Sequence, residues 1–96
     1  MVKVRRSPLA EEDYRDIWRH IATDNPDAAD RFLLRVDSKL QLYAKYPLMG
    51  SDRRSLGPNL RSFPVGNYLA FYQIVPGGIE LVRLLHAARS LESFVK

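Results

Sequence analysis

The spacing of apolar residues changes once along this chain, and that change constrains the fold more than any other feature. Between residues 14 and 46 apolar side chains recur about every 3.6 residues, as on one side of a helix. Between residues 60 and 85 they follow the two-residue alternation of β-strands. The chain has 96 residues, enough for one hydrophobic core, so residues 1–96 are expected to form a single α+β domain.

Two helices are predicted in the first half. Ser7 followed by Pro8 is typical of a helix start, with the serine as N-cap and the proline in the first turn. Asn25 followed by Pro26 indicates a second start, and that helix is predicted to run to about Tyr46. Because few residues join the two helices, we expect an antiparallel hairpin. Residues 2–5 alternate apolar and polar side chains, which predicts a short strand before the hairpin.

The second half is predicted to be a loop over residues 48–58 and then a three-stranded meander. The predicted strands are 60–65, 68–75 and 79–85. Gly66-Asn67 and Pro76-Gly77-Gly78 supply the turns between them. The predicted order is therefore strand, helix, helix and three-stranded meander, with the helical hairpin packed on a small, mostly antiparallel sheet.

Both faces of the last two strands are apolar. Strict alternation along the last strand predicts that Ile79, Leu81 and Leu85 share a face that the helical hairpin does not reach. A second layer must then cover this face, either a partner chain or the C-terminal tail, whose Leu91 and Phe94 are predicted to dock inward.

The composition excludes several kinds of functional site. The sequence has no cysteine, which excludes disulfides, thiolate catalysis and cysteine-type zinc sites. Its start has no apolar signal-peptide core, and no window is long enough to span a membrane, so we expect a soluble protein of the cytoplasm. Of the net charge of +4, residues 49–96 carry +3, which favours a nucleic acid or an acidic partner. No cofactor or metal is predicted.

Among residues that carry chemistry, the arginines of the second half are the best candidates. Arg83 interrupts an apolar strand, so its guanidinium must reach solvent, bind a partner or pair with an acid such as Glu80 or Glu92. His20 is expected to be exposed on its helix. His86 ends the last strand, where capping competes with acid–base chemistry.

Several blocks of the sequence resemble one family. The opening RRSPLAEEDYRDIWRHIATDNPDAADRF resembles the helical hairpin of ParE-type toxins. The stretches YPLMG, LGPNLRSFPVGNYLAFYQI and IELVRLLHAARSL resemble that family's loop and meander in the same order. The resemblance implies a RelE/ParE superfamily fold and the toxin of a type II toxin–antitoxin system, neutralised by a ParD-like antitoxin. It also implies inhibition of DNA gyrase, since that activity is associated with the ParE branch.

The RelE branch of the superfamily suggests an alternative, a ribosome-dependent mRNA interferase. In that case the catalytic candidates are Arg61, Arg83 and His86. The tail AARSLESFVK has no tyrosine and the loop has no lysine, so the set is incomplete and binding without catalysis is preferred. A non-toxic binding module is the third hypothesis.

Under the preferred hypothesis no residue is catalytic, and the candidates fall into two sets. The residues predicted to bind the antitoxin are Arg61, Ile79, Leu81, Arg83, Leu85 and Arg89. The candidates for binding the target are Arg53 and Arg54, from the long loop.

Overall fold

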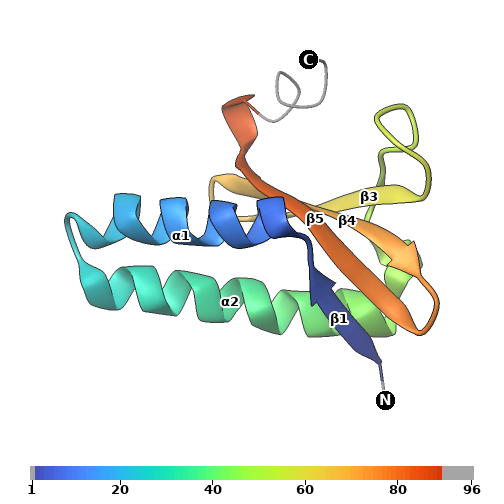
Figure 1. The fold of residues 1–96 in the computed structure, drawn as a ribbon, viewed down its shortest axis with the longest axis horizontal. Coiled ribbons are helices and arrows are strands. Elements are labelled where there is room, and N and C mark those ends of the chain that lie inside the picture. The colour runs from blue at the N-terminus through green and yellow to red at the C-terminus, as the bar shows by residue number, and fades with distance from the viewer. Residues whose placement is uncertain (1, 90–96) are drawn as a thin grey trace.

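A computed structural model describes residues 2–89 as two helices packed on a five-stranded sheet (Figure 1). The elements in chain order are β1 (Lys3–Arg6), α1 (Pro8–Ala22), α2 (Pro26–Lys45), the 3₁₀ helix η1 (Pro47–Met49), β2 (Ser51–Asp52), β3 (Leu60–Val65), β4 (Tyr68–Val75), β5 (Gly78–His86) and the 3₁₀ helix η2 (Ala87–Arg89).

Both helices begin where the capping residues predict. The Ser7 hydroxyl accepts a hydrogen bond from the Ala10 amide at 3.0 Å, which satisfies one of the unpaired amides of the first turn of α1. The Asn25 side chain accepts from the Ala28 amide at 3.1 Å at the start of α2. The two helices run antiparallel and lie against the same face of the sheet (Figure 1). The predicted helical hairpin is therefore confirmed.

The strands form one mixed sheet in the order β1-β5-β4-β3-β2. The meander of β3, β4 and β5 is antiparallel, as predicted. β1 pairs with β5 in parallel, and β2 adds two residues to β3 from within the segment predicted to be all loop. The helical hairpin leads from β1 to β2 at the opposite edge of the sheet, and the chain then returns through β3 and β4 to β5, beside β1.

The prediction that Ile79 and Leu81 lie on a face away from the helices is wrong. Both have 0% exposure and belong to the core under α1 and α2. The register explains this, because Ile79 lies opposite Ile74 and Leu81 opposite Tyr72, on the face of β4 that packs against the helices. Leu81 pairs with Tyr72 but Arg83 pairs with Phe71, so Val82 is an extra residue that forms a β-bulge.

The bulge also explains why strict alternation fails along β5. One extra residue reverses which face the following side chains take, so Leu84 joins Ile79 and Leu81 in the helix-packed core. Leu85 pairs with Leu69 and is half-buried on the other face. Only this last residue of the predicted trio therefore stays available to a second layer.

Part of the second face is covered by the chain itself. The residues 53–59 fold back on it, and Arg53 donates to the Ser62 hydroxyl at 2.8 Å while Gln73 donates to the Pro58 carbonyl at 2.9 Å. Ser62 and Phe71 are consequently buried although they face away from the helices. Leu91 and Phe94, predicted to dock inward, lie outside the described residues.

Within residues 2–89 no helix has both the length and the apolar character needed to cross a bilayer.

Candidate partner-binding surfaces

Arg83 is held by α1 rather than left for a partner. Its Nε and Nη2 atoms donate to the Asp13 carboxylate at 2.9 and 3.1 Å. The hydrogen bond with Asp13 raises the pKa of Arg83 above its ordinary value, so the guanidinium stays charged. Of the two acids weighed from the sequence, Glu80 pairs with Arg5 at 3.7 Å and Glu92 lies outside the described residues.

The same carboxylate also secures the bulge. The Leu84 amide donates to Asp13 at 2.9 Å, and the Ser7 hydroxyl donates to the Val82 carbonyl at 2.8 Å. These contacts satisfy backbone groups that the bulge removes from the strand ladder. The Asp13–Arg83 pair therefore joins the irregular part of β5 to the first turns of α1, which is a structural role.

Arg61 also makes its hydrogen bonds within the molecule. Its Nη1 atom donates to the Leu48 and Gly50 carbonyls at 3.2 and 2.7 Å. Beside it, the Tyr72 hydroxyl donates to the Pro47 carbonyl at 2.6 Å and accepts from the Gly50 amide at 3.1 Å. Burial raises the pKa of Tyr72 above its ordinary value. Arg61 and Tyr72 together fix the path of the chain from η1 into β2.

The two loop arginines, Arg53 and Arg54, differ in how accessible their side chains are. Arg53 is half-buried, bonded to Ser62, and its guanidinium lies 5.9 Å from the centre of the Phe71 ring. Arg54 makes a bidentate pair with Asp52, with Nε donating to Oδ1 and Nη2 to Oδ2, and its side chain is 72% exposed. The side-chain hydrogen bond from Arg54 lowers the pKa of Asp52 to about 2. Of these two candidates, Arg54 has the more accessible side chain.

His86 lies at the opposite end of the sheet from Arg61. His86 pairs with Tyr68, whereas Arg61 pairs with Tyr72, four residues further along β4. No hydrogen bond joins the two, and Arg83 between them is occupied by Asp13. The three residues considered for RNA cleavage therefore do not share one site.

His86 lies near His20, and sequence reasoning missed this proximity. Two adjacent pockets, of about 330 and 560 Å³, are both lined by His20, Tyr68 and His86. The Tyr68 and His86 rings meet edge to face, with centroids 5.4 Å apart. Arg89 lines the larger pocket. No local pattern connects His20 on α1 with His86 on β5, because only the packing of α1 across β5 brings them together.

Several of the exposed large apolar residues lie at the end of α2 and in η1. The side chains of Leu42, Tyr46, Leu48 and Met49 are exposed by 46%, 56%, 71% and 51%. We call these four residues the apolar corner. Sequence reasoning placed Tyr46 at the end of the second helix and residues 48–58 in a loop, although three large apolar residues on either side of Pro47 are a detectable signal. An exposed group of this kind indicates a protein interface.

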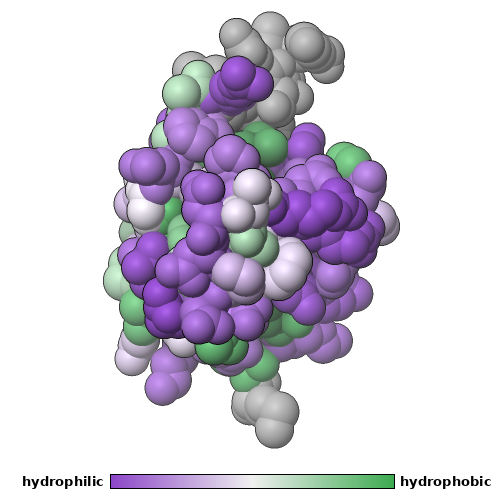
Figure 2. Space-filling view, turned by 90° about the vertical axis from the view of Figure 1, so that its left-hand side faces the viewer, coloured by the Kyte–Doolittle hydropathy of each residue, from purple (hydrophilic) through white to green (hydrophobic). Residues whose placement is uncertain are grey.

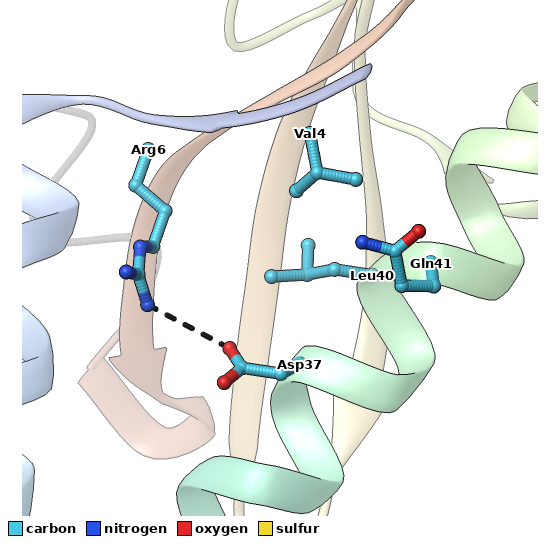
Figure 3. A pocket seen from close by; sticks show the side chains of 5 residues that line it. All are labelled: Val4, Arg6, Asp37, Leu40 and Gln41. Carbon is cyan, nitrogen blue, oxygen red and sulfur yellow. Dashed lines mark ion pairs between the residues drawn. The ribbon is translucent and has the colours of Figure 1, made fainter. Parts of the chain in front are cut away.

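A small pocket between β1 and α2 has a different character (Figure 3). It measures about 270 Å³, with Val4 and Leu40 on its walls and the Arg6–Asp37 ion pair across it at 3.6 Å. Asp37 also accepts from the Tyr14 hydroxyl at 2.8 Å, and the Arg6 guanidinium lies 4.6 Å from the Tyr14 ring centre. The polar groups satisfy one another, so this network serves to hold β1 against the helices.

No group of three or more His, Asp or Glu side chains in residues 2–89 is arranged to hold a metal ion.

Comparison with known proteins identifies the family. The family model described as "ParE toxin of type II toxin-antitoxin system, parDE" matches residues 4–91. This chain belongs to the ParE toxin family. Toxin ParE3 of Caulobacter vibrioides (strain ATCC 19089 / CIP 103742 / CB 15) is 26% identical over 92 residues, which span 95% of this ParE toxin and 92% of that protein.

The architecture of this ParE toxin also matches a solved structure. A chain of the "Chromosomal ParDE TA system from P. aeruginosa" superposes with a TM-score of 0.73 and 17% sequence identity, covering 90% of this chain and 96% of that one. At this identity the similarity concerns the fold. The predicted RelE/ParE-type α+β fold is thereby confirmed.

Membership in the family makes the chain the toxin component of a type II toxin–antitoxin system, a class in which the toxin has an antitoxin partner. For this ParE toxin, the apolar corner and the exposed side chains of Arg54 and Arg89 are accessible to other molecules.

Proposed function

We propose that this ParE toxin binds DNA gyrase in the cytoplasm, inhibits it and thereby arrests replication until a cognate ParD-like antitoxin sequesters the toxin. The family match carries the proposal. Action by binding is supported by the internal engagement of Arg61 and Arg83, because a guanidinium already bonded to carbonyls or to a carboxylate is a poor candidate for substrate chemistry.

The apolar corner is the surface that we assign to the antitoxin. It replaces Ile79 and Leu81, whose burial leaves them no role at an interface. An amphipathic helix that laid its apolar side over Leu42, Tyr46 and Leu48 would remove three exposed side chains from water. Leu85 near the end of β5 and Arg89 in η2 remain further contact candidates for a partner that wraps around the molecule.

Acidic residues in that partner would complement the toxin. The chain carries a net charge of +4, most of it in residues 49–96, so opposite charge would speed association. Arg54 remains the candidate for contact with gyrase, because its guanidinium projects from the loop with 72% of the side chain exposed.

Two parallel assays test the proposal. Purified protein is added to a gyrase supercoiling reaction and, separately, to cell-free translation, each with and without the cognate antitoxin. The expected result is loss of supercoiling that the antitoxin reverses, with translation intact. Specific ribosome-dependent cuts in mRNA would instead select the interferase hypothesis. No effect in either assay would select a non-toxic binding module.

A further inference from the structure

The charged residues of α2 are divided between two sides of the helix. Asp30 accepts a hydrogen bond from the Trp18 indole at 2.8 Å, and Asp37 accepts from Tyr14, so both acids face α1. Arg31, Arg35 and Lys39 follow one another at four-residue intervals, which places them along another side at steps of about 6 Å. We call these three residues the basic track.

The basic track runs beside the β3–β4 turn. Lys39 donates to the Pro64 carbonyl at 3.1 Å. Arg35 lies against the turn, since a side chain added at Gly66 would come within 3.4 Å of its Nη2 atom. Its guanidinium also lies 5.4 Å from the centre of the Phe32 ring. Asp27, one turn before Arg31, is the acid on this side of α2.

The track meets the smaller of the two pockets that His20 and His86 both line, because Arg35 forms part of its wall. This pocket of about 330 Å³ is lined by His20, Ile21, Phe32, Arg35, Gly66, Asn67, Tyr68 and His86, and none of them is an acid. In the part of the chain that the structure describes, no carboxylate pairs with Arg35 or with either histidine.

The pocket therefore offers several hydrogen-bond donors to an anion. His86 accepts from the Ala88 amide through Nδ1 at 3.2 Å, so its neutral form carries the proton on Nε2 and donates from there. Arg35 adds a planar guanidinium, the group best suited to a phosphate, and the Tyr68 hydroxyl is a further donor.

We propose that this pocket and the basic track bind successive phosphate groups of a single nucleic-acid strand. Cations spaced along a groove edge are what a polyanion requires, and each neutralised phosphate releases counterions that favour binding. The side of the molecule at the α1–α2 connection is mainly hydrophilic, with separate hydrophobic spots (Figure 2). That surface suits a solvated strand better than an apolar protein interface, for which the apolar corner at the other end of α2 is available.

The test uses the full chain alone, without gyrase, so its result is independent of the supercoiling assay. Fluorescence anisotropy follows binding of short labelled oligothymidylate and oligouridylate at low salt, and the tighter of the two identifies DNA or RNA as the source of the phosphates. The expected effect of Arg35→Gln is an increase in Kd of about tenfold. The slope of log Kd against log salt should fall by about one.

Lys45→Gln is the matched control, since it removes one exposed cation from the far end of the same helix. It should leave Kd unchanged. Equal weakening by Arg35→Gln and Lys45→Gln would overturn the proposal, because net charge alone would explain it. Absence of binding at low salt would overturn it as well. Displacement of the oligonucleotide by an equal charge concentration of polyglutamate would assign the pocket to an acidic protein segment instead.

Discussion

The Arg83 guanidinium and the Asp13 carboxylate, 70 residues apart in sequence, form a bidentate pair with donor–acceptor distances of 2.9 and 3.1 Å. Their side chains are only 23% and 12% exposed, so neither charge is well solvated without the other. Because Asp13 also accepts from the Leu84 amide, the pair connects β5 at its bulge to α1. The structure thus assigns to stability a residue that the sequence alone points to as a binding group.

Arg83→Ala should therefore lower the free energy of unfolding by about 2 kcal/mol, because it leaves a mostly buried carboxylate without its cation. Urea denaturation measures the change. The matched control is Arg54→Ala, which removes an arginine from an exposed pair with Asp52 and should leave the midpoint unchanged. If the Arg83→Ala protein kept wild-type stability but lost binding to the antitoxin or to gyrase, Arg83 would be a binding residue instead.

A second stability prediction concerns Gly50, which lies directly against the Tyr72 hydroxyl. A Cβ atom at Gly50 would overlap that oxygen and approach the ring carbons Cε1 and Cζ at 2.9 Å. Gly50→Ala should lower the free energy of unfolding by about 1–3 kcal/mol, since the buried tyrosine cannot move without losing its bond to Pro47. Gly57→Ala is the control, because its Cβ would meet Leu60 at an ordinary 3.7 Å. Similar midpoints for the two variants in urea would contradict this account.

Sequence reasoning succeeds where the signals are local. The caps at Ser7 and Asn25 and the strands at 60–65 and 68–75 agree with the structure, because capping side chains, prolines and turn residues act over a few positions. β2 was missed because two residues carry no detectable alternation.

The failures concern contacts between distant segments. Alternation along one strand cannot show which face meets the helices, and the extra residue Val82 reverses the pattern midway along β5. Asp13 was not recognised as the partner of Arg83, because only the packing of α1 on β5 brings the two side chains together. The pocket shared by His20 and His86 has the same origin. The candidate site is therefore less predictable than the fold.

Tyr14 makes the stability of the folded state depend on pH in the alkaline range. Burial, with the hydrogen bond to Asp37, raises the pKa of Tyr14 above its ordinary value of about 10. The folded state then holds a proton that the unfolded chain loses above about pH 10, so stability is fully present below that pH and falls as pH rises.

Tyr14→Phe should lower the free energy of unfolding by about 1 kcal/mol at neutral pH, through loss of the bond to Asp37. Its stability should then fall less steeply than that of the wild type between about pH 9 and about pH 11. Urea denaturation across this range measures both effects. Tyr46→Phe, which alters an exposed ring, should match the wild type throughout. Parallel curves for Tyr14→Phe and the wild type would show that Tyr14 does not cause the alkaline loss.

The final prediction places the antitoxin on the apolar corner. The toxin coexpressed with its ParD-like antitoxin should elute from size-exclusion chromatography as one complex with an interface above about 1,200 Å². Leu48→Ser removes an anchor that is 71% exposed in the isolated toxin, so it should raise the Kd about tenfold or more without changing the unfolding midpoint. Leu9→Ser is the control, because Leu9 is 52% exposed in the first turn of α1 and is not one of the four corner residues. Added salt should slow association more than it speeds dissociation, since charge complementarity acts mainly on the encounter. Equal affinity of the Leu48→Ser and Leu9→Ser proteins for the antitoxin would exclude the apolar corner as its binding surface.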